Sequence, residues 1–209
     1  MQSLVTLEGA AVRRFPFPLK TFCAAICILF LAKGDLLALC FDLHAINHQG
    51  EWWRLITGHL VHSNSSHLFW DLCAFVGASW YLERHAPALL LPSWLAGLIT
   101  VNLLLMSPLS ELSYYCGLSG LLFAPLIVAL FQFQKQIGGL TGYLPLLVTG
   151  AKLAWELLSS EHFLVQSDWA PYPEAHLAGL TGGLLLMAGV TLFPWIANGK
   201  NGKKETIER

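Results

Sequence analysis

Apolar residues in this chain gather into six long runs that are separated by polar stretches. An α-helix needs about 20 predominantly apolar residues to cross the ~30 Å hydrocarbon core of a bilayer. The runs are close to this length, although Lys33 and Asp35 interrupt the first. The pattern therefore predicts an all-α membrane protein with a bundle of six transmembrane helices. The runs extend from Leu19 to Leu39, His67 to Leu82, Ala88 to Met106, Leu118 to Phe133, Ile137 to Leu158 and Ala175 to Trp195.

The composition agrees with integration into a membrane. Hydrophobic residues make up 55% of the 209 residues and charged residues only 12%. A soluble domain carries roughly twice that charged fraction, so there are too few charges here to cover a surface facing water. The net charge of −1 argues against nucleic acid as a partner. We expect one membrane domain (19–197) between a cytoplasmic N-terminal segment (1–18) and a basic cytoplasmic tail (198–209), with no removable signal peptide.

The charges between the runs predict the orientation in the membrane. Basic residues precede the first run, follow the last, and occur at Arg84 and Lys135 in the second–third and fourth–fifth connections. The other three connections are acidic, with Arg54 as their one basic residue. By the positive-inside rule both termini are cytoplasmic and the acidic connections face outward. The first outward connection (41–66) is long and rich in Trp and His, so we expect it to be functional.

A Gly-x-Ser-Gly motif, Gly117 to Gly120, begins the fourth run. Alone it is a weak signal, because Gly and Ser commonly pack transmembrane helices together. A polar segment leads into it, however, and the apolar run of ~16 residues spans only ~24 Å as a helix. We therefore expect the helix to begin below the outer surface. Ser119 would lie at its N-terminus, where free backbone N–H groups can stabilise an oxyanion.

A serine hydroxyl needs a base to act as a nucleophile, and His176 begins the sixth run on the same side. Gly179 and Gly183 follow it as a small-xxx-small pair, which lets two helices approach closely. If the fourth and sixth helices pack along this face, His176 comes within reach of Ser119. The alternative is an interfacial histidine that faces water. No third carboxylate is evident in the sequence to orient His176, so we expect a Ser–His dyad.

Histidines are also frequent near the start of the second run. His67 and Asp71 lie four residues apart and share one helix face. They are interpreted either as a polar pair that holds the connection down or, together with His59 and His62, as metal ligands. No HExxH or similar motif supports the metal.

Taken in order, four segments resemble the rhomboid family. They are the Trp-Arg pair in the first outward connection, the His-x-x-x-x-His run into the second helix, the Gly-x-Ser-Gly motif, and His-x-x-Gly-x-x-x-Gly in the sixth helix. The resemblance implies an intramembrane serine protease without a cofactor. It assigns Ser119 as the nucleophile and His176 as the general base. His67, with the backbone N–H of Ser119, would help to form the oxyanion hole, and Gly117 would support the site.

The chain departs from the rhomboid pattern at two positions. Asp71 stands where rhomboids usually have Asn, and an ionised carboxylate would repel an oxyanion. Asp71 is therefore expected to be either protonated or paired with His67. Phe123 stands where a tyrosine commonly stacks on the catalytic imidazole. The resemblance gives Glu51 and Arg54 a structural role in bracing the first connection.

Within this family the short chain and the Lys152-x-x-x-Glu156 pair resemble the rhombosortase branch. Lys152 and Glu156 are spaced for an i,i+4 ion pair, which would lower the cost of both charges in a membrane. The resemblance implies a bacterial inner-membrane enzyme, open to the periplasm, that removes C-terminal Gly-Gly-type sorting tails. Its partners would be substrate transmembrane helices and the lipid bilayer. The alternative is an inactive rhomboid-like protein that binds transmembrane helices.

Several properties are left open by the sequence. The substrate, the choice between hydrolysis and transfer to an amine, and the oligomeric state are among them. The five cysteines form no Cys-x-x-Cys pair, and most of them fall in apolar runs. Cys40 and Cys116 both lie near the outer side, so a disulfide bond between them is possible, but the sequence alone does not determine it.

Overall fold

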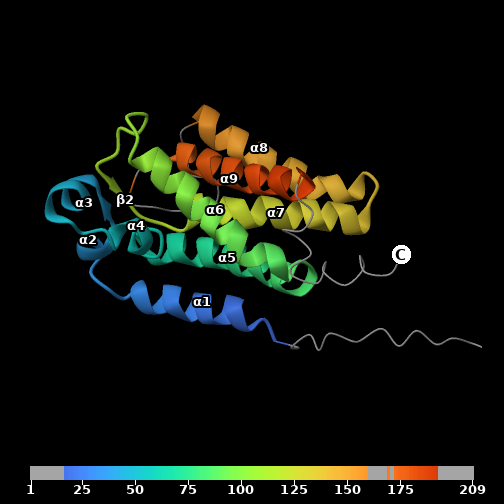
Figure 1. Cartoon of the computed structure of the whole chain (residues 1–209), viewed down its shortest axis with the longest axis horizontal. Coiled ribbons are helices and arrows are strands. Elements are labelled where there is room, and N and C mark those ends of the chain that lie inside the picture. Colours follow the sequence, from blue (N-terminus) through green and yellow to red (C-terminus); the bar gives the residue numbers. More distant parts are fainter. Residues whose placement is uncertain (1–16, 160–168, 170–171, 193–209) are drawn as a thin grey trace, which may run out of the picture.

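The computed structural model describes residues 17–159, 169 and 172–192. In these ranges the chain forms a bundle of six long helices with a group of short elements at one end (Figure 1). Three of the described helices, α6, α7 and α9, are long and apolar enough to cross a membrane. The long helices are α1 (Leu19–Leu31), α5 (Ser65–His85), α6 (Pro87–Leu105), α7 (Ser119–Ile137), α8 (Leu144–Ser159) and α9 (Pro173–Leu192).

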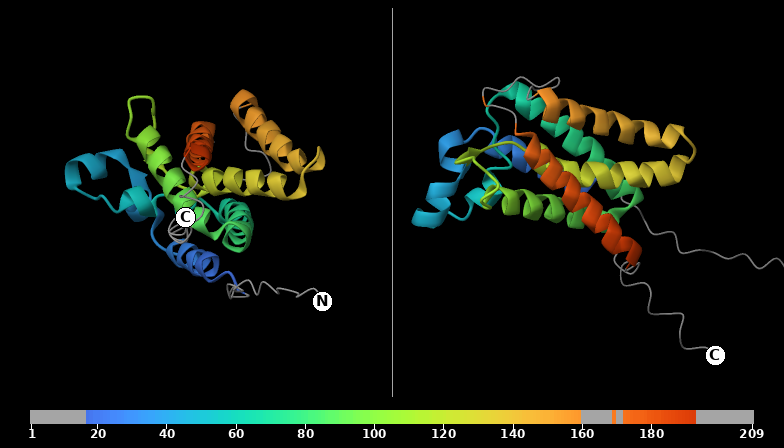
Figure 2. Two further views of the ribbon diagram at one scale, coloured as in Figure 1. Left: turned by 45° about the vertical axis from the view of Figure 1, so that its right-hand side comes forward. Right: turned by 90° about the horizontal axis from the view of Figure 1, so that it is seen from above.

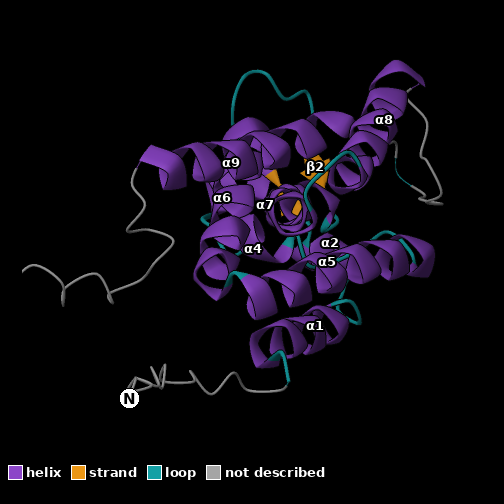
Figure 3. Ribbon diagram, turned by 90° about the vertical axis from the view of Figure 1, so that its right-hand side faces the viewer, coloured by secondary structure: helices purple, strands orange, loops and turns teal. Residues whose placement is uncertain are grey.

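Helix α7 lies at the centre of the bundle, with α5, α6 and α9 around it (Figure 3). Half of the residues in its most apolar stretch are buried inside the protein, compared with a third of those in the corresponding stretches of α6 and α9. Two clusters of buried side chains surround it, one towards each end, and Leu121, Phe123 and Val128 of α7 belong to them. A residue on α7 can therefore meet several neighbouring helices at once.

Glycines bring α9 into backbone contact with both of its main neighbours. A Cβ atom at Gly179 would overlap the carbonyl oxygen of Gly120 in α7, and one at Gly183 would lie 2.8 Å from the carbonyl oxygen of Ala124. On the other side, a Cβ at Gly182 would lie 2.7 Å from the carbonyl oxygen of Ala96 in α6. The expected packing of the fourth and sixth helices along the small residues is thus confirmed, because only glycine fits at such separations.

The long first connection (41–66) is folded rather than irregular. It contains β1 (Phe41–Asp42), α3 (Leu43–Gln49) and α4 (Arg54–Thr57), preceded by α2 (Leu36–Leu39). β1 pairs antiparallel with β2 (Tyr114–Tyr115), which leads into α7. We call this group of short elements the cap. It projects beyond the long helices at one end of the bundle (Figure 2).

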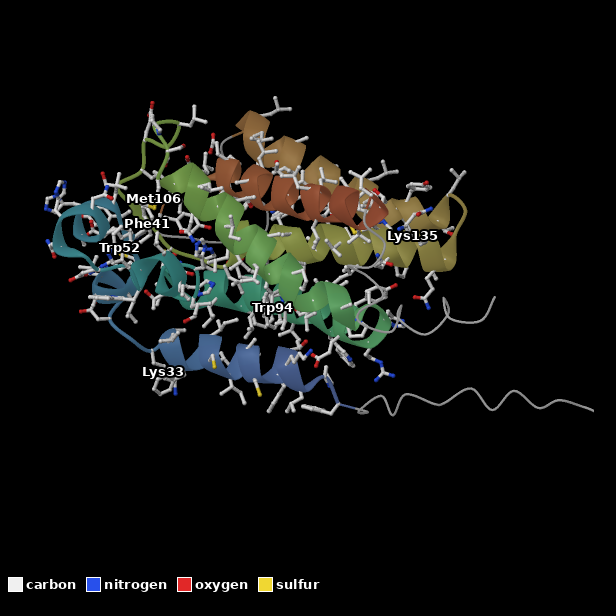
Figure 4. The ribbon with its side chains drawn as sticks, in the orientation of Figure 1. Lys33, Phe41, Trp52, Trp94, Met106 and Lys135 are labelled. Atoms are coloured by element: carbon white, nitrogen blue, oxygen red, sulfur yellow. The ribbon has the colours of Figure 1, made fainter. Side chains whose placement is uncertain are left out.

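A buried arginine holds the cap together. The guanidinium of Arg54 forms an ion pair with Glu51, and its Nη1 donates to the carbonyl oxygens of Leu37 and Cys40, both at 2.8 Å. Trp52 and Phe41 lie at this end of the molecule, and Lys135 lies at the opposite end (Figure 4).

The predicted end of the first run and the predicted start of the fifth run are wrong, and both errors have a local cause. The first run was expected to continue to Leu39, but α1 ends at Leu31. The Asp35 side chain then accepts a hydrogen bond from the backbone of Leu37 and caps the separate helix α2. The fifth run was expected from Ile137, but α7 continues to that residue and α8 begins at Leu144. Gly138 and Gly139, between α7 and α8, adopt positive φ angles, a conformation that ends helices.

Helix α7 is also longer than its apolar run. It contains 19 residues, about 28 Å, because polar residues after Phe133 continue the last turn. The sixth run was expected to reach Trp195, which lies outside the described residues; α9 is described to Leu192.

Candidate active site

Ser119 is the first residue of α7 and is partly buried. The chain reaches it through Gly117, whose φ angle of 117° is rarely adopted by residues with a side chain. A Cβ atom there would lie 2.6 Å from Cε1 of His67. Glycine is therefore required both by the backbone angle and by the close approach of the histidine ring. The N-terminal backbone amides of the helix lie at the serine, as expected.

His176 lies in the first turn of α9, and its ring packs against α7. The imidazole stacks on the ring of Phe123 with a centroid separation of 4.7 Å and an interplanar angle of 15°. Phe123 follows Ser119 by one helical turn, so the two residues share one face of α7. Beside them, a Cβ at Gly120 would lie 3.0 Å from the Cβ of Ala175. The structure thus places the imidazole of His176 against the face of α7 that carries Ser119.

The expectation that no carboxylate orients His176 is wrong. Oε2 of Glu156 in α8 lies 3.0 Å from Nδ1 of His176, and both side chains are buried. The other oxygen of Glu156 forms the predicted ion pair with Lys152, which is confirmed. The i,i+4 spacing had accounted for Glu156 as the ion-pair partner of Lys152 in the same helix. Its contact with His176 depends on how α8 packs beside α9, which the sequence pattern does not reveal.

Asp71 collects three hydrogen-bond partners at the start of α7. Its Oδ2 accepts from the backbone N–H of Leu118 at 3.1 Å and lies 3.3 Å from Nε2 of both His62 and His67. Nδ1 of His67 lies 3.2 Å from Oγ of Ser63. Of the two alternatives for Asp71, the structure has the pairing with His67. The contact with His62 was not anticipated, because His62 lies before α5 and shares no helix face with Asp71.

Tyr115 is a second residue that the sequence analysis missed. Its buried hydroxyl accepts a hydrogen bond from the backbone N–H of Gly120, the residue after Ser119, at 3.3 Å. Burial, followed by the charge of Asp71, raises the pKa of Tyr115, so the phenol stays neutral. Its position in β2 gave no signal, because a strand of two residues has no recognisable periodicity.

The remaining histidine of the expected cluster belongs to the cap. Nε2 of His59 lies 3.4 Å from Oδ1 of Asn102 in α6, and burial lowers the pKa of His59 to about 4. The ring is therefore neutral at physiological pH. In the described ranges, no group of three or more His, Cys, Asp or Glu side chains is arranged to hold a metal ion.

The family comparison agrees with this arrangement. The family model of the rhomboid domain matches residues 49–193, more than half of the chain, from the cap to the end of α9. No curated protein matches the sequence. The matched range contains every residue of the site described above. With its apolar helices and this match, the chain is a membrane protein that belongs to the rhomboid family.

Proposed function

We propose that this protein is an intramembrane serine protease in which Ser119 is the nucleophile and His176 the general base. The observation that carries the proposal is the stacking of His176 on Phe123, one turn from Ser119 on the same face of α7. Rhomboid proteins are generally intramembrane serine proteases. A partly buried serine and a buried histidine near the N-termini of two packed helices supply the nucleophile and the base that such a reaction needs.

The reaction proceeds in two steps. Oγ of Ser119 attacks the carbonyl carbon of an extended substrate peptide while its proton passes to Nε2 of His176. The imidazolium returns that proton to the leaving amine, which completes the acyl-enzyme. Water then attacks the ester, with His176 again as the base, and the released serine regains its proton.

Backbone and histidine donors stabilise the tetrahedral oxyanion in this proposal. The N–H of Ser119 belongs to the first turn of α7, where amides have no partner within the helix. The rhomboid resemblance assigns the second donor to His67. Its Nε2 faces Asp71 and its Nδ1 faces Ser63 in the structure, so Nε2 has to turn from Asp71 to donate to the oxyanion. Asp71 thus acts on the orientation of His67. It does not contact the oxyanion itself, which a carboxylate would repel.

The proposed topology has six membrane spans, with α1, α5 and α8 in addition to α6, α7 and α9. Arg84 and Lys135 lie in the last turns of α5 and α7, and Lys135 is at the end of the bundle opposite the cap (Figure 4). The positive-inside rule therefore directs the cap outward. We assign the protein to the bacterial inner membrane with the site open to the periplasm. Following the resemblance to the rhombosortase branch, the substrates are secreted proteins anchored by a C-terminal Gly-Gly, helix and basic tail.

A fluorophosphonate probe tests the proposal without knowledge of the substrate. Such probes react with serines that a neighbouring base activates. We expect labelling of the purified protein in lipid bicelles and complete loss of labelling in Ser119→Ala. Wild-type protein that is folded and remains unlabelled would support the alternative, an inactive rhomboid-like protein that binds transmembrane helices.

A further inference from the structure

We propose that Glu156 is a positioning residue that holds His176 in the tautomer and orientation needed for proton transfer from Ser119. This inference rests on the proposed function and extends the expected dyad to a Ser119–His176–Glu156 triad. The carboxylate comes from α8, a helix that carries neither the nucleophile nor the base.

The geometry of the two side chains carries the inference. Oε2 of Glu156 lies 3.0 Å from Nδ1 of His176, and the Glu156 side chain is only 4% exposed. A carboxylate at this distance accepts a hydrogen bond only if Nδ1 carries the proton. Nε2 of His176 is then unprotonated and can accept the proton of a serine. The second ring contact, with Phe123, fixes the plane of the imidazole.

The charge of Glu156 has a further consequence for the reaction. When the proton of Ser119 reaches Nε2, the ring becomes a cation in a site of low dielectric. A fixed carboxylate beside Nδ1 stabilises that cation without taking up the proton. The proton therefore stays on His176 until the leaving amine accepts it, and Glu156 remains ionised throughout.

Lys152 accounts for the presence of this carboxylate inside a helical bundle. A buried unpaired carboxylate is costly, and the ion pair with Lys152 one turn earlier offsets part of that cost. The Lys152 ammonium also lies 5.6 Å from the centroid of the Phe123 ring, beneath which His176 stacks. Lysine, glutamate, histidine and phenylalanine thus form one contiguous cluster on three helices.

The experiment measures the rate of fluorophosphonate labelling as a function of pH. Glu156→Gln keeps a hydrogen-bond acceptor for Nδ1 but removes the charge, so we expect labelling to slow by on the order of 10²-fold. We also expect the acidic limb of the pH–rate profile to move to lower pH, because the imidazolium loses its anionic partner. Glu156→Asp should restore part of the rate.

Glu83→Gln is the matched control. Glu83 is also a carboxylate of the helical bundle, but it accepts hydrogen bonds from the backbone of Lys20 and Thr21 at 2.9 Å and caps α1. Its loss should change stability without moving the pH profile. If Glu156→Gln is poorly folded, Glu156→Gln combined with Lys152→Met removes the uncompensated lysine charge and gives the same readout. If the wild type is labelled and the Glu156 variants show the same rate and pH profile, the triad is overturned but the protease proposal stands. If the wild type is not labelled, the protease proposal itself is overturned.

An independent observation in the cap carries a second inference. β1 and β2 pair in a register that places Phe41 opposite Tyr115 and Asp42 opposite Tyr114. Continued by one residue, this register places Cys40 directly opposite Cys116. The N–H of Leu43 bonds to the carbonyl of Ser113 in the same register. Since hydrogen-bonded and non-hydrogen-bonded pairs alternate, the two cysteines form a non-hydrogen-bonded pair, in which Cα atoms lie about 4.5 Å apart.

We infer that Cys40 and Cys116 form a disulfide bond when the cap folds on an oxidising side of the membrane. The expected Cα separation is within the range of natural disulfides. Each thiol loses one proton and one electron as the S–S bond forms. The disulfide of a thiol oxidant, such as an oxidoreductase or oxidised glutathione, is reduced to two thiols in exchange. The bond would anchor the segment immediately before Gly117 to the cap.

The buried surroundings of the two thiols imply that the disulfide bond forms during folding, before the thiols become inaccessible. Both side chains are buried and pack with Val61 in one apolar cluster. Burial raises the pKa of Cys116 to about 12, and burial also raises the pKa of Cys40. Because the thiolate is the reactive species, the folded protein exchanges these thiols slowly. Once formed, the bond is protected by its burial, which keeps an attacking thiolate away from the two sulfur atoms.

Alkylation followed by mass spectrometry of the intact protein tests this inference independently of protease activity. Membranes are quenched in acid, and the protein is denatured and alkylated with a maleimide before or after reduction. We expect Cys40 and Cys116 to be labelled only after reduction, while the exposed Cys23, Cys27 and Cys73 serve as internal controls that label in both cases. In Cys116→Ser, Cys40 should label without reduction. Labelling of both Cys40 and Cys116 in unreduced wild type overturns the inference.

Discussion

Replacing Ser119 or His176 with alanine is expected to abolish cleavage while the protein still folds. A secreted reporter that ends in Gly-Gly, a transmembrane helix and a basic tail, co-expressed with this protein in bacteria, would no longer be released. We expect each loss to be at least about 10³-fold, because the serine supplies the covalent bond and the histidine moves its proton. The double variant should be no worse than either single one, since the two residues act as a unit.

Ser93→Ala is the matched control for this experiment. Ser93 is fully buried in α6, and its hydroxyl bonds the carbonyl oxygen of Leu90 in its own helix at 2.7 Å. Its loss should leave release of the reporter unchanged. Release that persists in Ser119→Ala or His176→Ala, with the protein correctly inserted, would contradict the proposed mechanism.

The second large effect is expected from a single methyl group between α7 and α9. In Gly179→Ala the new Cβ overlaps the carbonyl oxygen of Gly120, the residue after Ser119. Backbone cannot rotate away as a side chain can, so the helices must separate. We expect a loss of roughly 1–3 kcal/mol in the free energy of unfolding. We also expect a severe loss of labelling by the serine probe, because the same contact brings His176 to α7.

Gly189→Ala provides the control in the same helix. A Cβ at Gly189 meets no atom within 4 Å, so its thermal unfolding in bicelles should match that of the wild type. Equal stability and equal labelling of Gly179→Ala would show that the two helices do not depend on this contact.

Asp71 distinguishes this site from the usual rhomboid pattern. Its carboxylate replaces the usual Asn amide, and the structure surrounds it with two histidine rings and one backbone N–H. These contacts connect the segment before α5 to the residue that precedes Ser119. All three contacts are to Oδ2, and the negative charge of a carboxylate oxygen attracts several donors more strongly than the neutral oxygen of an amide does.

Much of this protein follows from local sequence signals. The apolar runs predicted the positions of the long helices, because each run is long enough to form a helix that is buried in protein or lipid. Gly179 and Gly183 predicted the close packing of α7 and α9, since small residues at this spacing leave a flat helix face. The spacing of Lys152 and Glu156 predicted their ion pair. Helix ends were less accurate, because capping by Asp35 and the turn at Gly138 outweighed the apolar pattern.

Only the tertiary structure decided which of the predicted residues meet, and with which further partners. The contact of Glu156 with His176 joins α8 to α9, and the contact of Tyr115 with Gly120 joins β2 to α7. The pairing of Phe41 with Tyr115 joins β1 to β2 across a long stretch of sequence. None of these contacts follows from the period of a single element, because each depends on the packing angle or strand register between separate elements. The sequence by itself determined a membrane bundle with a candidate serine and histidine, and the packing of its helices added the carboxylate that the histidine contacts.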